Sequence, residues 1–299
     1  MTIAPSATPR TNTGPFPDRL HSPGVLGQVK RPLRWLRGEY HFLTAPLRGL
    51  PSVLIIGAQK SGTTSLFQYL VQHPKVLPPL GKEVHYFDFH YADGIKWYRG
   101  NFPYRRQLRG GALTLDASPY YLVHPLVPHR AAQLLPEVKL IAVLRNPVDR
   151  ALSHYQHEVR HRRESLSFAD AIEREPERLA GEEERLWDDP NYYSANHHRY
   201  SYTRRGLYLE QLQRWMQHFP RSQLLVLQSE RLFRDPAGAT SQVYTFLDLE
   251  PHRLERYKPF LAGNYDPGLP ADLRAKLVAY FEPHNRELYR WLGEEFDWT

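Results

Sequence analysis

The stretch SVLIIGAQKSGTTSLFQYLVQHP, residues 52–74, decides the fold, because it reads as a strand, a loop and a helix in succession. Residues 52–57 are an apolar run ended by glycine, which is typical of a strand buried on both faces of a parallel sheet. Apolar residues then recur at helical spacing until Pro74 ends the helix. The sequence therefore predicts a buried strand that feeds a helix through a short glycine-containing loop.

This loop nearly matches the phosphate-binding loop of nucleoside triphosphatases, G-x-x-x-x-G-K-[ST]. Gly57 and Gly62 keep its spacing, but Thr63 takes the place of the lysine and Lys60 lies inside the loop. Backbone N–H groups and the positive end of the helix dipole favour an anion at such a loop. Hydroxyl donors for the same anion are offered by Ser61, Thr63, Thr64 and Ser65. We predict an anion site, while the missing lysine weakens a kinase or ATPase interpretation.

The rest of the chain alternates between strand and helix patterns. Further strands are expected at 111–116, 138–145 and 222–228. Helices are expected at 126–135, 147–163, 206–219, 236–248 and 271–292. Repeated βα units predict one α/β domain with a P-loop-like, three-layer fold, in which helices flank a central parallel sheet.

Composition limits the class of protein. The 299 residues are 41% hydrophobic, enough for a packed core, and the absence of cysteine excludes disulfides and thiolate metal sites. The formal net charge of +7 favours an anionic partner, although no nucleic-acid-binding module is recognisable. No apolar run reaches the roughly 18 residues of a membrane span and no secretory signal opens the chain, so we expect a cytoplasmic protein.

Two segments near the N-terminus differ from the rest of the chain. Residues 1–24 are rich in Pro, Thr and Ser without periodicity, and we expect a disordered tail. Residues 26–50 mix basic and apolar side chains and could touch a membrane surface. Pro32 and Pro46 interrupt any long helix there, which favours packing across the domain instead.

A second cationic site is predicted where the strand at 138–145 ends. Arg145 is its last residue, Asn146 is a candidate N-cap, and Pro147 suits the first helical position. An arginine fork can bind phosphate oxygens through two hydrogen bonds, whereas the alternative is a structural ion pair between Arg145 and Asp149. We favour the phosphate because the first loop already calls for an anionic partner.

Three polar stretches admit a structural and a functional interpretation. His154, His157 and His161 fall near one helical face as metal ligands would, but an exposed basic helix explains them adequately. The charged residues 173–189 are expected to form a solvated helix with i,i+4 ion pairs. The segment NYYSANHHRY, 191–200, is either a loop on the acceptor side or an ordinary surface loop.

Three motifs in order carry a family resemblance: GAQKSGTTSLFQYLVQHP (57–74), KEVHYFD (82–88) and LRNPVDRALSHYQH (144–157). Together they resemble the sulfotransferases that use 3'-phosphoadenosine-5'-phosphosulfate (PAPS), and most of all the glycan branch that includes the heparan sulfate sulfotransferases. The likeness covers about residues 50–292, and a sulfotransferase domain is expected over 25–299. It implies metal-free, in-line transfer of a sulfuryl group from PAPS to an acceptor hydroxyl, on a carbohydrate or similar molecule.

The resemblance also implies a role for individual residues. Lys60 would contact the oxygen that bridges phosphate and sulfate, and Glu83 would take the acceptor's proton, with His85 as the alternative base. Lys82 and His85 would contact the acceptor, and Lys82 could also polarise the donor. The donor itself would be bound by residues 60–65 together with Arg145 and Ser153.

Two departures from the heparan-type members bear on the acceptor. Ala117 stands where those members have a lysine, and no basic loop bracketed by cysteines closes over the donor, so Arg204, Arg205 or Lys258 would have to do so. Two rival classes remain. One is a magnesium-dependent nucleotide kinase, which would use Asp116, and the other is a non-catalytic protein that binds an anionic polymer.

Overall fold

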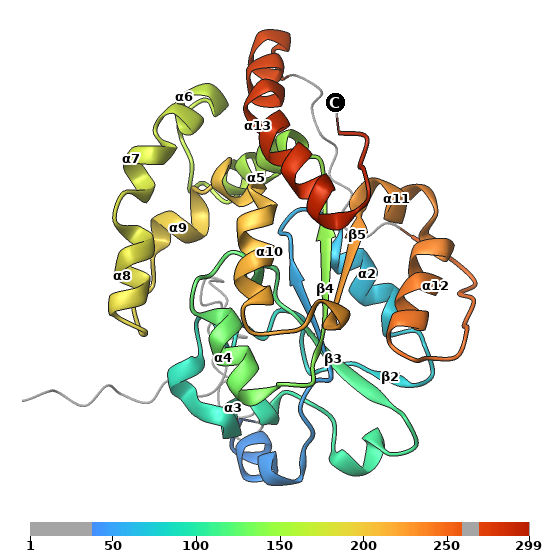
Figure 1. Cartoon of the computed structure of the whole chain (residues 1–299). Coiled ribbons are helices and arrows are strands. Elements are labelled where there is room, and N and C mark those ends of the chain that lie inside the picture. The colour runs from blue at the N-terminus through green and yellow to red at the C-terminus, as the bar shows by residue number, and fades with distance from the viewer. Residues whose placement is uncertain (1–37, 259–268, 299) are drawn as a thin grey trace, which may run out of the picture.

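The computed structural model describes residues 38–258 and 269–298, so the expected tail at 1–24 lies outside the described part of the chain. All five strands pair in parallel in one sheet with the order β2-β3-β1-β4-β5 (Figure 1). The strands are β1 (Val53–Gly57), β2 (Val76–Leu77), β3 (Leu113–Ala117), β4 (Lys139–Leu144) and β5 (Leu224–Gln228). The predicted α/β fold with a central parallel sheet is confirmed.

Strand β1 occupies the centre of the sheet and is buried along its whole length. Its side chains alternate between the two faces, since Leu54 and Ile56 belong to one hydrophobic cluster and Val53 and Ile55 to the other. The apolar sequence of β1 is thus explained by the hydrophobic clusters that pack on both faces of the sheet.

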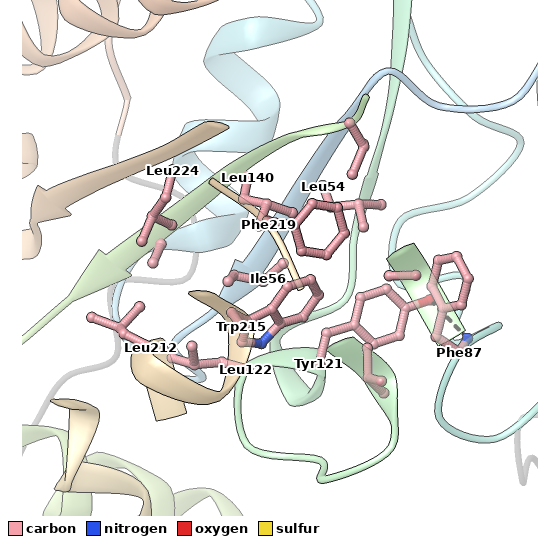
Figure 2. Packing of buried hydrophobic residues seen from close by; sticks show 14 of the residues in the cluster. Leu54, Ile56, Phe87, Tyr121, Leu122, Leu140, Leu212, Trp215, Phe219 and Leu224 are labelled. Carbon is pink, nitrogen blue, oxygen red and sulfur yellow. Dashed lines mark hydrogen bonds between the residues drawn. The ribbon is translucent and has the colours of Figure 1, made fainter. Parts of the chain in front are cut away.

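Helices α3 (Gly94–Gly100), α4 (Val127–Leu134), α10 (Tyr208–Met216) and α13 (Ala271–Leu292) contribute to the cluster on the first face. Figure 2 shows its centre, where Trp215 and Leu212 of α10 pack beside Ile56 of β1 and Leu140 of β4. Trp215 is fully buried, and its large apolar area makes α10 a fixed element against the sheet.

Helices α2 (Thr63–Leu70), α11 (Ser229–Arg234) and α12 (Pro236–Phe246) cover the second face (Figure 1). Leu66 and Phe67 of α2 lie in the same cluster as Val243 of α12. Because α2 follows β1 directly and packs against the sheet, its N-terminus is held at the carboxyl end of the central strand. The expected helices at 126–135, 236–248 and 271–292 agree with α4, α12 and α13 within a few residues.

Helix α5 (Pro147–Arg160) follows β4 and joins a third hydrophobic cluster. Alongside it lies a group of short helices that the sequence did not predict separately (Figure 1). They are α6 (Phe168–Glu173), α7 (Glu175–Leu179), α8 (Glu182–Asp188) and α9 (Ala195–Arg199). Helix α9 of this group contacts a residue that follows β3, since Nδ1 of His197 lies 2.7 Å from the hydroxyl of Tyr120.

The charged run at 173–189 is not the single solvated helix that was expected. It forms α7 and α8, and both Glu175 and Glu182 are buried. Glu175 accepts hydrogen bonds from the backbone N–H groups of Thr203 (2.7 Å) and Arg204 (2.8 Å). The pattern of charges in the sequence cannot show that Glu175 is buried. Its burial depends on two backbone N–H groups, about 30 residues further along the chain, that need a hydrogen-bond acceptor.

The described part of the N-terminal segment packs across the domain, as favoured. Arg48 is buried and donates to the carbonyl oxygen of Phe102 at 2.8 Å and contacts Nδ1 of His41 at 2.7 Å. Residues 26–37 lie outside the described ranges. Of the helices in residues 38–258 and 269–298, none combines the length and the apolar character needed to cross a membrane.

Candidate active site

The predicted anion loop lies where three neighbouring strands, β3, β1 and β4, reach the carboxyl edge of the sheet. The loop leaves β1 at Gly57, and the N–H of Ala58 donates to the carbonyl oxygen of Val143 at 2.7 Å. Gly62, with φ of 95°, caps α2, and a Cβ there would lie 2.9 Å from the ring of Phe233. Only glycine avoids both the strain and the clash at this turn.

The loop has unused hydrogen-bonding capacity. Ser61 is fully buried, yet its Oγ has no hydrogen-bond partner among the described residues. No acidic side chain occupies the first turn of α2, and no side chain caps it. Buried donors are almost always paired in folded proteins, so this loop fits a bound anion such as a phosphosulfate.

Backbone strain occurs at all three residues predicted to be catalytic. Five non-glycine residues in the described ranges have positive φ, and three of them are Lys60 (71°), Glu83 (62°) and His85 (55°). Such conformations cost free energy and concentrate at functional sites. Lys60 is held by Arg145, whose Nη1 donates to the Lys60 carbonyl oxygen at 3.2 Å. The two predicted anion-binding segments are therefore in direct contact.

The segment 82–88 is tied to the end of β3, next to the loop. The N–H of His85 donates to Oγ of Ser118 at 3.1 Å, and the N–H of Tyr86 donates to the hydroxyl of Tyr121 at 2.8 Å. Ser118 follows β3 directly, and Tyr121 lies in the short 3-10 helix Pro119–Leu122 that comes next. Parallel strands bring their carboxyl ends to one edge, which explains why a motif 20 residues past the loop returns to it.

A network of charged groups runs through this segment. Lys82 Nζ contacts Glu83, and His85 Nε2 lies 3.7 Å from Glu83 Oε2. On its other side, His85 Nδ1 lies 2.7 Å from Oδ2 of Asp88, whose side chain is fully buried. Asp88 also accepts from the N–H of Phe89 at 2.7 Å. The imidazole is thus fixed between two carboxylates.

This network shifts the pKa values of Glu83 and His85 in opposite directions. Burial would raise the pKa of Glu83, but the hydrogen bond from His85 and the charge of Lys82 outweigh it and lower the pKa to about 2. Burial would lower the pKa of His85, but the charge and hydrogen bond of Asp88, together with Glu83, raise the pKa to about 10. At neutral pH the structure therefore holds an ionised Glu83 beside a protonated His85.

Asp116, which the kinase alternative needs, is buried inside the fold. Its carboxylate accepts hydrogen bonds from the hydroxyls of Ser118 (2.8 Å), Tyr121 (2.9 Å) and Tyr98 (3.2 Å). Burial raises the pKa of Asp116. Its oxygens are engaged in supporting the segment at 82–88 rather than turned to a metal at the loop. Within the described ranges, no three His, Asp or Glu side chains are grouped as a metal site would require.

Helix α5 begins as predicted. Asn146 caps it by accepting from the N–H of Val148 at 3.0 Å, and Pro147 is its first residue. Asp149 contacts Arg274 at 2.5 Å, so the alternative in which it pairs with Arg145 is not what the structure shows. Ser153 is buried on the same helix, two turns from Arg145.

The expectation that the three histidines of α5 lie exposed is wrong for His154. His154 is fully buried, and neither ring nitrogen has a hydrogen-bond partner in the described structure. Burial, followed by the charges of Arg205 and Arg150, lowers the pKa of His154 well below its usual value. His157 and His161 are more exposed, and their rings are in tilted contact with centroids 4.2 Å apart.

The segment 191–200 lies against the segment at 82–88 through aromatic contacts. Phe89 stacks on His85 with centroids 4.9 Å apart, and it also contacts Tyr193 (5.3 Å) and His198 (4.9 Å). The hydroxyl of Tyr193 lies 2.8 Å from Nδ1 of His198. Of the two interpretations given above, the geometry favours a wall beside the site, because half-exposed aromatic side chains continue from His85.

Arg205 was one of three candidates, with Arg204 and Lys258, for closing over the donor, but it is buried and contacts the loop. Its guanidinium donates to Gln59 Oε1, in the residue before Lys60, and to backbone carbonyl oxygens of the segment 191–200. Arg204 instead makes ion pairs with Glu183 and Glu210. Sequence reasoning did not find the contact between Arg205 and Gln59, because it joins residues 146 positions apart.

A profile of the sulfotransferase domain family matches residues 50–259, which include the loop, the segment at 82–88 and the start of α5. The chain belongs to the sulfotransferase domain family. Mouse heparan sulfate glucosamine 3-O-sulfotransferase 6 is 32% identical over 274 residues, covering 84% of this chain and 74% of that protein. Membrane-associated sulfotransferase kil1 of Dictyostelium discoideum is 28% identical and spans 83% of this chain and 66% of its own.

A solved structure supports the same conclusion. The crystal structure of a sulfotransferase from Alicyclobacillus acidocaldarius is 32% identical to this sulfotransferase, with a TM-score of 0.60. It covers 83% of this chain and 98% of the other. The chain is therefore a sulfotransferase enzyme, and its family implies PAPS as the co-substrate. The kinase and the non-catalytic polymer-binding interpretations are set aside.

Proposed function

We propose that this sulfotransferase moves the sulfuryl group of PAPS to a hydroxyl of a carbohydrate acceptor, with Glu83 as the base. The observation that carries the proposal is the placement of Lys60, Glu83 and His85, each with a strained backbone, at one edge of the sheet. Strain of this kind persists only where the surrounding structure holds it in place. The two hydrogen bonds from the segment at 82–88 to residues after β3 provide that hold.

The donor would be bound at its two anionic ends. The loop residues 60–65 would hold the 5'-phosphosulfate through backbone N–H groups and the unpaired Ser61 hydroxyl. Arg145 and Ser153 would hold the 3'-phosphate, since an arginine fork matches phosphate oxygens. Binding the remote phosphate fixes the distance from sulfate to acceptor, which lowers the entropic part of the barrier.

The reaction then needs one proton transfer and one charge stabilisation. The acceptor oxygen forms a bond to sulfur as the bond from sulfur to the bridging oxygen breaks, and the hydroxyl proton passes to Glu83. A carboxylate with a pKa of about 2 suffices as base, because the hydroxyl becomes strongly acidic once its oxygen bonds to sulfur. Lys60 would stabilise the negative charge that develops on the leaving phosphate oxygen.

His85 suits a supporting role better than that of base. Its pKa of about 10 keeps the imidazole protonated at neutral pH, so it has no lone pair with which to accept a proton. A protonated His85 can orient Glu83 and can donate to the acceptor or to a sulfate oxygen. Lys82, which contacts Glu83, would add a further positive charge on the acceptor side.

A carbohydrate acceptor is supported by two observations. The relatives with 30–32% identity include several named heparan sulfate glucosamine 3-O-sulfotransferases. The aromatic wall of Phe89, Tyr193 and His198 offers flat faces on which a sugar ring can stack. Ala117 in place of a family lysine makes heparan sulfate itself less suited than other carbohydrates.

The test is transfer of radiolabelled sulfate from PAPS to a panel of heparan sulfate, chemically desulfated heparan, neutral oligosaccharides and simple phenols. We expect incorporation into at least one carbohydrate in excess chelator, and none with the Glu83→Gln variant. Incorporation into phenols alone would overturn the carbohydrate assignment. Full activity of Glu83→Gln would overturn the assignment of the base.

A further inference from the structure

Arg205 is a buried cation that touches both halves of the site. The residue is 3% exposed, and its guanidinium is engaged on every side. Nε donates to Oγ of Ser201 at 2.7 Å, and Nη2 donates to the carbonyl oxygens of His197 (2.9 Å) and His198 (2.7 Å). Nη1 donates to Oε1 of Gln59, in the donor loop.

The guanidinium also lies over an aromatic ring that continues towards His85. Its carbon is 4.8 Å from the centroid of Tyr120, and Tyr120 contacts Phe89 at 5.3 Å. Phe89 in turn stacks on His85. One side chain therefore joins the strained loop at Lys60, the wall at 191–200 and the aromatic contacts that back the proposed base.

This arrangement is unusual for a buried arginine because its hydrogen-bond partners are neutral oxygens. Burying a charge without a paired carboxylate is costly, and such groups are normally neutralised by an ion pair. Burial lowers the pKa of Arg205 to about 10, which still leaves it charged at neutral pH. A merely structural link between two segments could be made by neutral groups at a smaller cost, which points to a use for the charge.

We propose that Arg205 is the positioning residue that fixes the donor loop relative to the acceptor wall. This inference rests on the proposed function. Through Gln59, Arg205 holds the loop at the residue next to Lys60, while Arg145 donates to the Lys60 carbonyl oxygen itself. Through the carbonyl oxygens of His197 and His198, Arg205 holds the acceptor wall. Its positive charge also offsets the negative charge of a phosphosulfate in the loop.

The contact between Arg205 and the donor loop can be removed by a substitution at either residue. Gln59→Ala removes the loop contact and leaves the other bonds of Arg205 intact. Arg205→Lys keeps the charge but replaces a fork of donors with a single ammonium group, which cannot serve Gln59, Ser201 and two carbonyl oxygens together. The matched control is Arg214→Lys on α10, because Arg214 likewise donates to a backbone carbonyl oxygen, while its other partner is the carboxylate of Glu183 rather than a residue of the loop.

The measurement is the dissociation constant of 3'-phosphoadenosine-5'-phosphate (PAP), by calorimetry, for the wild type, both single variants, the double variant and the control. The bond from Arg205 to Gln59 lies within the protein, so its loss weakens PAP binding through the geometry of the donor loop, and the worth of a hydrogen bond to a charged group sets an upper scale of about tenfold. Each single variant should therefore bind PAP several-fold, up to about tenfold, more weakly. The double variant should be no weaker than Arg205→Lys, because both changes remove the same link. The control should bind like the wild type.

Steady-state kinetics with an active acceptor give a second readout. A positioning role predicts that Gln59→Ala lowers kcat as well as donor affinity, at an unchanged melting temperature. Unchanged PAP affinity and kcat in Gln59→Ala, or fully additive losses in the double variant, would overturn the inference while leaving the proposed function intact. Failure of the wild type to bind PAP would overturn both. If Arg205→Lys does not fold, Gln59→Ala alone still decides.

Discussion

The substitution Asp88→Asn tests what fixes the protonation states of the charged network in the segment 82–88. The Asp88 carboxylate is fully buried, and its Oδ2 lies 2.7 Å from Nδ1 of His85. The substitution keeps the size and one accepting oxygen but removes the negative charge. The imidazolium of His85 then loses its nearest buried counter-charge, while Glu83 at 3.7 Å remains.

The expected change in the pKa of His85 follows from its contact with Asp88. A hydrogen bond to a charged group contributes about 1.5–3 kcal/mol, and one pKa unit corresponds to about 1.36 kcal/mol. The pKa of His85 should therefore fall by about one to two units from its value of about 10. If a protonated His85 supports transfer, the alkaline limb of the rate profile moves towards neutral pH by the same amount.

The assay is the pH profile of kcat between pH 6 and 10, together with NMR titration of the His85 ring. The chain offers a matched control in Asp93→Asn, because Oδ2 of Asp93 lies 2.7 Å from Nδ1 of His90 at the same i,i+3 spacing. That pair is more exposed, so its loss should change neither the profile nor the His85 titration. An Asp88→Asn profile that coincides with the wild type would refute the assigned role of the network.

The contact between His85 and Asp88 also leads to a prediction about the stability of the fold. The pKa of folded His85 is raised above its unfolded value of about 6.5, so the pair stabilises the fold fully below that pH. This contribution is lost as pH rises through about 10. The difference in unfolding free energy between wild type and Asp88→Asn should thus be largest below about pH 6.5 and shrink above it. A difference that grows with pH would contradict the sign.

Three further predictions test other parts of the site. Lys60→Ala should lower kcat by at least about 100-fold, as removal of a charge-stabilising donor does, and near-normal turnover would refute the contact with the leaving oxygen. Arg145→Ala should mainly weaken PAP binding, measured by calorimetry, and an unchanged dissociation constant would refute the 3'-phosphate anchor. Gly62→Ala should destabilise the fold by about 1–3 kcal/mol in chemical denaturation, because its Cβ would meet Phe233 at a positive φ; a neutral result would show that the turn relaxes.

The elements fixed by local pattern were predictable from the sequence. The strand at β1 and the long helix α13 follow from apolar periodicity, and the start of α5 follows from Asn146 and Pro147. Strand β2 has two residues, too few for any periodicity, and was missed. The motifs at 57–74, 82–88 and 144–157 point to one candidate site because each lies where a strand or its connection reaches the carboxyl edge of the sheet.

The rest depends on contacts between distant segments. The burial of His154 and of Glu175 reflects the packing of α5 and α7 against residues near 202–205, which their own charge pattern does not reveal. Arg205 has no local signal at all, since its partners are a side chain in the loop and two carbonyl oxygens. Polar links of this kind are set by geometry, and a single sequence shows only the residue types that could form them.

The most direct test of the central claim is calorimetric titration of the protein with PAP, in excess chelator, with ATP and magnesium as the comparison. We predict tight binding without metal and a clear preference for the 3'-phosphorylated nucleotide. No binding of PAP, or tighter binding of magnesium-ATP, would contradict the assignment of the loop and Arg145 to a PAPS site.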